Sequence, residues 1–185
     1  MNTEMVKAIL ARRKTVTRRL IKPQPKDKLE FIVAGDTKHI GKWFDRKNGG
    51  YWIPPCCCGD VLYVRETWCK GSLNGGAEQY FYKADDNDFH CQWHPSIHMP
   101  KEAARIFLRV TKVRAERLQE ITTDDIWYKE GIPFGLCIAP YDGFARLWNS
   151  TIKKADLAKY GWDANPWVWV IEFERISKEE AMKNV

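Results

Sequence analysis

The stretch Arg12-Arg13-Lys14-Thr15-Val16-Thr17-Arg18-Arg19 places four arginines and a lysine among β-branched residues. Branched Cβ atoms pack well on a pleated surface and lose side-chain freedom in a helix, so the stretch predicts a strand that extends to Ile21. Because side chains alternate between the two faces of a strand, Lys14 and Thr17 converge only if the chain turns or bulges between them. Two interpretations are open: a solvated basic strand, or an anion-facing site that contains a nucleophile and a base.

The excess positive charge of the chain is concentrated around this stretch. The formal net charge is +6, and residues 1–28 hold nine Lys or Arg against two acidic residues, a net of +7. The remaining residues hold 21 basic and 22 acidic groups, a net of −1. Such a concentration is typical of a face that binds a polyanion, and it favours the anion-facing interpretation.

The composition is that of a globular protein. Hydrophobic residues make up 44% and charged residues 29% of the 185 residues, which separates this chain from disordered sequences. A chain of this length suits one domain, here residues 1–185, and no repeat or linker divides it. The nine tryptophans are more than a core requires and indicate stacking surfaces as well.

The sequence also indicates the cellular compartment of the protein. Residues 1–20 are too polar for a signal peptide, and no apolar run approaches the ~20 residues that span a bilayer. We therefore expect a cytoplasmic protein with no membrane partner. In a reducing compartment the six cysteines are expected to remain thiols rather than form disulfides: Cys56, Cys57, Cys58, Cys69, Cys91 and Cys137.

Hydrophobic periodicity and turn residues predict several strands and few helices. Besides the strand after Lys14, strands are expected over residues 61–68, 80–82, 106–118 and 167–173. Helices are expected over residues 3–10 with Thr3 as the cap, from Thr122 or Thr123 to Gly131, over 144–157, and after a capping box at Ser177. Residues 26–50 are expected to form a hairpin or variable loop, and 84–100 an irregular segment. The pattern predicts an α+β fold, a small mixed β-barrel with peripheral helices and inserted loops.

In this order, the elements resemble the ASCH (activating signal cointegrator homology) family, whose fold is a barrel like that of pseudouridine synthase and archaeosine transglycosylase (PUA-like). The matching pieces include residues 13–19 with the helix before them, Gly59-Asp60-Val61-Leu62, Lys129-Glu130-Gly131 and residues 168–173. Residues 95–100 and 165–169 resemble the phage and prophage members of the family. The resemblance covers nearly the whole chain and implies insertions at about 26–50 and 70–100.

The resemblance implies a function in RNA or nucleoside binding. Some small members of the family resemble amidohydrolases that remove an acetyl group from acetylated cytidine, and others resemble ribonucleases. Carried over to this chain, the catalytic residues of the amidohydrolase branch are Lys14, Thr17 and Glu130. Amide hydrolysis requires a nucleophile and a proton acceptor, which a threonine hydroxyl and a neutral lysine supply. An ordinary ion pair between Lys14 and Glu130 remains the alternative.

Further residues are expected to bind the substrate. Arginine forms bidentate contacts with phosphate and an aromatic ring stacks on a base, so we expect substrate contacts from Arg13, Arg18, Arg19, Arg65, Tyr63 and Trp68. No cofactor or metal is expected, because the spacing of His90, Cys91, His94 and His98 fits no standard zinc pattern. A non-catalytic RNA-binding module and a metal-assisted ribonuclease remain alternatives to the amidohydrolase.

Overall fold

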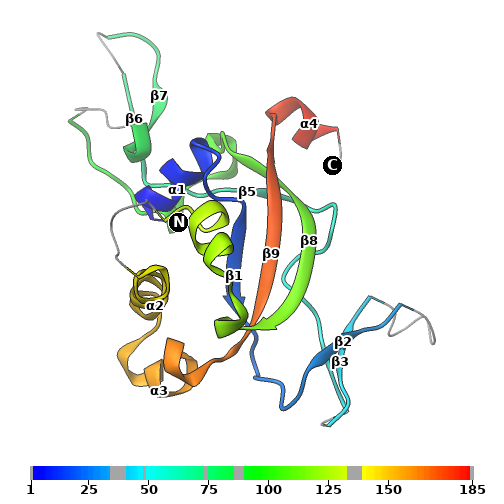
Figure 1. Cartoon of the computed structure of the whole chain (residues 1–185). Helices are drawn as coiled ribbons and strands as arrows, with labels where there is room; N and C mark the ends of the chain where they lie inside the picture. The colour runs from blue at the N-terminus through cyan, green and yellow to red at the C-terminus, as the bar shows by residue number, and fades with distance from the viewer. Residues whose placement is uncertain are drawn as a thin grey trace.

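The fold is a mixed α+β arrangement around one curled antiparallel sheet. The computed structural model describes residues 2–33, 41–47, 49–72, 75–85, 90–132 and 139–183. The sheet has four strands in the order β1-β9-β8-β5, which are Val16–Leu20, Trp167–Ile176, Phe107–Arg117 and Val61–Tyr63. Figure 1 shows β1, β9 and β8 side by side, and the sheet curls into a half-barrel.

The two long strands β8 and β9 form the centre of the sheet. They pair over nearly their whole length, with a register shift between Val110 and Lys112 that bends β8. Residues 167–171 of β9 are all buried, because elements cover both faces of the sheet there. By contrast, β1 is hydrogen-bonded in the sheet only to β9, so one of its edges remains open.

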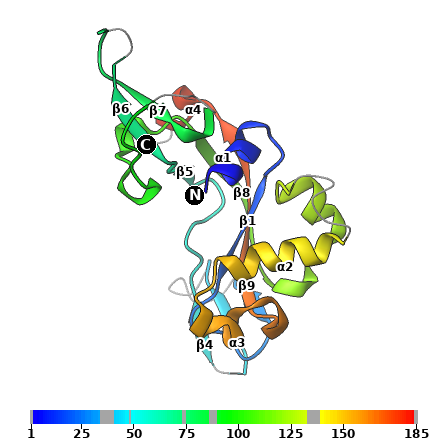
Figure 2. The ribbon, with the colours of Figure 1, turned by 90° about the vertical axis from the view of Figure 1, so that its left-hand side faces the viewer.

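Short helices lie around the sheet (Figure 2). Helix α1 is Thr3–Leu10, α2 is Pro140–Ser150, α3 is Leu157–Tyr160 and α4 is Lys178–Met182. Asn2, and not Thr3, caps α1 by accepting a hydrogen bond from the Met5 amide, whereas the predicted capping box at Ser177 is confirmed at α4. One π-helical turn, η5, spans Asp125–Lys129. Single 3₁₀ turns lie at Lys83–Asp85, Ser96–His98, Lys101–Ala103, Leu118–Glu120, Lys154–Asp156 and Trp162–Ala164.

Two smaller sheets occupy the predicted insertions and project from opposite ends of the half-barrel (Figure 1). Strands β2 (Leu29–Phe31), β3 (Trp43–Asp45) and β4 (Gly50–Trp52) form one, so the segment 26–50 is more than a single hairpin. Strands β6 (Trp68–Gly71) and β7 (Gln79–Tyr82) form the other. The strand expected over 61–68 ends at Tyr63, and Trp68 already belongs to the second small sheet.

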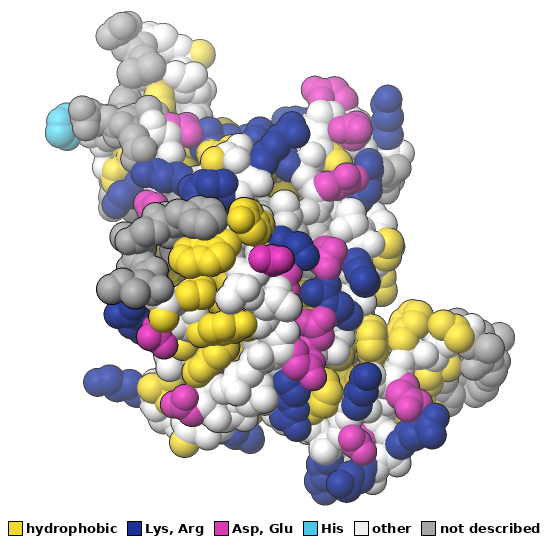
Figure 3. Space-filling model, viewed as in Figure 1, with side chains coloured by type: hydrophobic (Ala, Val, Ile, Leu, Met, Phe, Trp, Pro, Cys, Tyr) yellow, Lys and Arg dark blue, Asp and Glu magenta, His cyan; other side chains and the backbone are white. Residues whose placement is uncertain are grey.

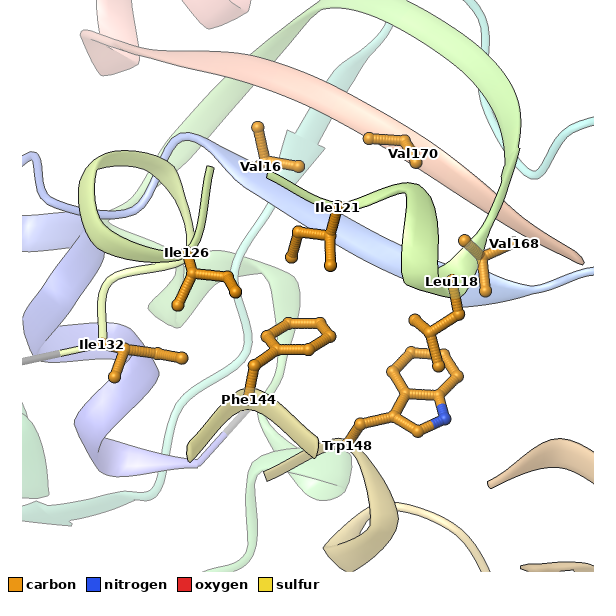
Figure 4. Packing of buried hydrophobic residues seen from close by; sticks show 9 residues of the cluster. All are labelled: Val16, Leu118, Ile121, Ile126, Ile132, Phe144, Trp148, Val168 and Val170. Atoms are coloured by element: carbon orange, nitrogen blue, oxygen red, sulfur yellow. The ribbon is translucent and has the colours of Figure 1, made fainter. Parts of the chain in front are cut away.

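The core that supports β1 lies between the sheet and the segments that cover it. Figure 4 shows Val16, Val168 and Val170 of the sheet facing Phe144 and Trp148 of α2. Leu118, Ile121 and Ile126 pack between the sheet and α2, and Ile132 lies beside Phe144. Burying an aliphatic side chain of this size contributes roughly 1.5–3 kcal/mol, so the cluster holds α2 and η5 firmly against β1.

The expectation that the cysteines remain thiols is wrong for one pair. Cys69 of β6 and Cys91 form a disulfide, because the Trp68 and His94 backbones pair next to them and bring the two Cα atoms to 6.5 Å. Cys56, Cys57 and Cys58 are free thiols, and Cys137 lies outside the described residues. Burial raises the pKa of the Cys56 thiol, which suits a residue packed in the core.

We expect the disulfide to contribute to stability. It closes a loop of 22 residues, and loss of such a cross-link costs about 2–4 kcal/mol. Cys91→Ser should therefore lower the urea midpoint of the oxidised protein, while exposed Cys57→Ser should leave it unchanged. Equal midpoints for the wild type and Cys91→Ser under oxidising conditions would contradict the pairing.

No helix in the described ranges is long and apolar enough to cross a membrane.

Candidate functional site

A cleft of about 530 Å³, here called the β1 cleft, borders β1 and also contacts β9, β8 and β5 through Phe173, Leu108 and Leu62. Thr17, Arg18 and Arg19 all line it. Side chains of successive residues in a strand point to opposite faces, so contact with three residues in a row indicates that the cavity reaches the edge of the strand. This geometry also brings Lys14 and Thr17 to one cavity, although they lie at positions that would point to opposite faces of a regular strand. Lys14 precedes β1, which begins at Val16.

A buried cluster of charges lies at one end of the cleft. Lys14 Nζ is 2.9 Å from Glu130 Oε2 and donates a further hydrogen bond of 3.2 Å to the Glu130 carbonyl oxygen. Arg18 donates through Nη1 to Glu130 Oε1 and lies 3.4 Å from Asp125 Oδ2 through Nη2. All four side chains are at least nine-tenths buried. Removing one member of such a cluster leaves a buried charge without its partner, which typically costs 3–5 kcal/mol.

The main chain positions Lys14 and Glu130 directly against each other. The two residues form an isolated antiparallel bridge, and the Thr15 amide donates to the Lys129 carbonyl. The close approach depends on Gly131, which has φ +73° and ends the η5 segment. A Cβ atom on Gly131 would lie 2.6 Å from Ala8 Cβ and 2.9 Å from Lys14 Cβ, so only glycine fits between α1 and Lys14.

Asp125 is the outer acid of the cluster. Burial acts to raise the pKa of its carboxyl, but the hydrogen bond from Lys129 and the positive charges of Lys129, Arg18 and Arg114 together hold that pKa below its usual value. Thr122 Oγ1 accepts a hydrogen bond from the Asp125 amide, which fixes the start of η5 and confirms the predicted role of Thr122. Asp125 therefore stays ionised and neutralises part of the Arg18 charge.

The opposite walls of the cleft are mostly apolar and aromatic. Phe144 and Trp148 of α2 line the cleft, and so do Tyr63 and Arg65. The Arg65 guanidinium donates to the Ile97 carbonyl and to the Tyr63 hydroxyl, and it lies 5.7 Å from the Tyr63 ring centroid. These contacts hold the Tyr63 ring, which lines the cleft, in place. A cavity with aromatic walls and a few charged groups at one end suits a planar polar ligand.

The structure brings together most of the residues that the sequence singled out. Lys14, Thr17 and Glu130 line the cleft together with the predicted binding residues Arg18, Arg19, Arg65 and Tyr63. The Thr17 hydroxyl has no hydrogen-bond partner within the described segments. Arg13 is exposed and donates to the Gly131 carbonyl at 3.1 Å.

Two predicted binding residues have environments that differ from the expectation. Trp68 is not among the cleft residues: its ring packs against Tyr80 and His94, at centroid distances of 5.6 and 5.0 Å. Arg18 lines the cleft, but its guanidinium is committed to Glu130 and Asp125. Arg19, by contrast, is exposed and makes no salt bridge to a described residue, so it is the arginine of β1 that can contact a phosphate.

Sequence reasoning missed several residues of the site. Asp125 was not identified, although its spacing of four residues from Lys129 in a predicted helix favours an ion pair. Phe144 and Trp148 lie at helical spacing in the helix expected over 144–157, and nothing in that pattern indicates that they also border a cleft. No set of three or more His, Cys, Asp or Glu side chains among the residues that the structure describes is arranged to hold a metal ion.

Comparisons with family models, with curated proteins and with solved structures find no significant match for this chain.

Proposed function

We propose that this protein binds RNA or a modified nucleoside in the β1 cleft and hydrolyses an acyl group from the exocyclic nitrogen of a cytidine. The observation that carries the proposal is the convergence of Lys14, Thr17 and Glu130 on one aromatic-walled cavity. The half-barrel is, on this proposal, a PUA-like domain of the ASCH type. The resemblance described above supplies the substrate class, and the geometry of the cleft is compatible with it.

The proposed reaction begins with a proton transfer inside the Lys14–Glu130 pair. The 2.9 Å hydrogen bond allows the proton of the Lys14 ammonium to pass to the Glu130 carboxylate, which leaves a neutral amine and a carboxylic acid. Thr17 Oγ1 then attacks the acyl carbonyl carbon and gives its proton to Lys14. As the carbon–nitrogen bond breaks, Glu130 protonates the leaving nitrogen, so that cytidine departs and an acyl ester of Thr17 remains.

Water completes the cycle. Its oxygen attacks the ester carbonyl carbon while Glu130 accepts one of its protons, and the free carboxylic acid departs as Lys14 returns a proton to Thr17 Oγ1. The net change is an amide and one water converted to an amine and an acid. The Arg18 guanidinium, which contacts Glu130, carries a fixed positive charge that favours the negatively charged tetrahedral intermediates.

A non-catalytic binding module is the second candidate. The observation that favours it is the close salt bridging of Lys14 and Arg18 with Glu130, which is also how a purely structural ion cluster is built. In that case the same cleft binds a base and its phosphates without breaking a bond. The two candidates share a binding face and differ only in turnover.

Turnover and binding distinguish the candidates. The purified protein should release acetate from N4-acetylcytidine, free or within a short RNA, in a chromatographic assay. Arg19→Ala should weaken RNA binding and reduce the slope of log K against log salt by roughly one, since one phosphate contact is lost. RNA binding without acetate release from any acylated cytidine would support the binding module. A protein that neither binds RNA nor releases acetate would exclude both candidates.

A further inference from the structure

Helix α1 ends in a motif that normally requires glycine. The Arg13 amide donates to the Ala8 carbonyl and the Arg12 amide donates to the Ile9 carbonyl, the hydrogen-bond pattern of a Schellman motif. Arg12 occupies the left-handed position of this motif with φ +57°. Glycine adopts that conformation without a steric penalty, whereas an L-residue with a Cβ atom pays for it. Arg12 thus occupies a position where the backbone favours glycine.

Arg12 faces a second cavity next to the cleft. This hollow has a volume of about 250 Å³ and lies between the turn after α1 and β9, lined by Ile9, Arg12, Lys14, Thr15, Phe173, Glu174 and Arg175. It shares Lys14 and Phe173 with the β1 cleft, so the two cavities lie on either side of these two residues. Figure 3 shows Lys and Arg side chains near the end of α1, and a mixture of Lys, Arg, Asp and Glu side chains near the upper end of β9.

The positive charges of the hollow are not balanced. The Arg12 guanidinium makes no hydrogen bond or salt bridge to any residue that the structure describes. Within the described ranges, the Arg175 guanidinium has only a long hydrogen bond of 3.4 Å to the Leu10 carbonyl. The one acid of the hollow, Glu174, is paired with Arg109 at 3.2 Å, and the Lys14 ammonium is held by Glu130. Two arginines therefore line one concave site without an acidic partner among the described residues.

We propose that this hollow binds a phosphate group through Arg12 and Arg175. Guanidinium groups are well suited to phosphate oxygens, and the Thr15 hydroxyl on the same wall can add a hydrogen bond. The position of the hollow next to the cleft identifies the phosphate as one that flanks the bound base. The assignment of the base rests on the proposed function, whereas the anion site rests on the geometry of the hollow alone. The ligand is then a nucleotide or an RNA strand rather than a free nucleoside.

The test uses Arg12→Gly, because the structural and the binding effects of this change have opposite signs. Glycine relieves the left-handed conformation, so the midpoint of thermal unfolding should rise by about 2 °C. Calorimetric affinity for cytidine 3′-monophosphate and for a short RNA should fall about tenfold, while affinity for cytidine should not change. Lys112→Ala is the control: it removes the same charge from an exposed position on β8 that does not line the hollow, and it should affect none of these affinities.

Two further measurements distinguish free phosphate from the phosphate of a nucleotide, and the hollow from the cleft. If inorganic phosphate competes with the nucleotide in the wild type but not in Arg12→Gly, the hollow is an anion site whether or not the base binds in the cleft. If the protein binds cytidine as tightly as cytidine 3′-monophosphate, the proposal that the cleft binds the base stands, and the proposal that the hollow binds phosphate is overturned. An unchanged nucleotide affinity in Arg12→Gly would also overturn it.

Discussion

Thr17→Ala is expected to abolish the release of acetate from N4-acetylcytidine, with a loss of at least about a thousandfold in kcat/KM. The reason is that the proposed reaction passes through an ester of the Thr17 hydroxyl, and alanine offers no oxygen to form it. The fold should be unaffected, because the Thr17 hydroxyl has no hydrogen-bond partner within the described ranges. The measurement is a steady-state assay of acetate release, with circular dichroism as the check on folding.

Two further substitutions distinguish chemistry from binding. Thr17→Ser keeps a hydroxyl at the same place and should retain measurable turnover. Lys14→Arg keeps the positive charge beside Glu130, but arginine cannot act as a base, so turnover should be lost. Full activity in Thr17→Ala would rule out the nucleophile. Loss of activity in Thr17→Ser to the level of Thr17→Ala would point instead to a packing role for the threonine methyl group.

Gly131→Ala should destabilise the protein by about 3 kcal/mol and disturb the site at the same time. The new methyl group would meet Ala8 Cβ at 2.6 Å and Lys14 Cβ at 2.9 Å, and the residue would be held at φ +73°. Overpacking typically costs about 1–3 kcal/mol and a left-handed L-residue about 1–2 kcal/mol. Because one of these two contacts is with Lys14 itself, relaxing it shifts Lys14 relative to Glu130. Urea unfolding measures the first effect and the acetate assay the second.

Gly59→Ala provides the matched control for this prediction. Gly59 also has a positive φ, +93°, but a Cβ atom there has no neighbour within 4 Å. The substitution therefore introduces the conformational penalty alone, about 1 kcal/mol, and leaves the Lys14 environment intact. Equal losses of stability in the two variants would show that the close approach of α1 and Lys14 at Gly131 is not the source of the effect.

Local signals in the sequence predicted most of the elements that build the site. The β-branched run before Ile21 specified β1, the alternation from Ile106 to Leu118 specified β8, and the capping box at Ser177 specified the start of α4. These predictions succeed because propensity, periodicity and capping act over a few neighbouring residues. Gly131, which follows η5 and its C-terminal cap Glu130, is a stop signal of the same class.

The elements that differ from prediction are those that depend on partners distant in sequence. The strand expected over 61–68 ends at Tyr63, and the next residues include Glu66, which is 1% exposed and bound to Arg105. A short sequence pattern carries no information about a partner 39 residues away. The disulfide between Cys69 and Cys91 was missed for the same reason, since it depends on the pairing of Trp68 with His94.

By itself, the sequence determined that a basic strand follows a first helix and that the excess positive charge lies there. Only the tertiary structure decided how those charges are used. Arg18 is neutralised by Glu130, 112 residues away, whereas Arg12 and Arg19 keep exposed guanidinium groups. The physical reason is that the electrostatic interaction of a side chain depends on its distance from other charges and on burial, and both are determined by how β1, η5 and α1 pack together.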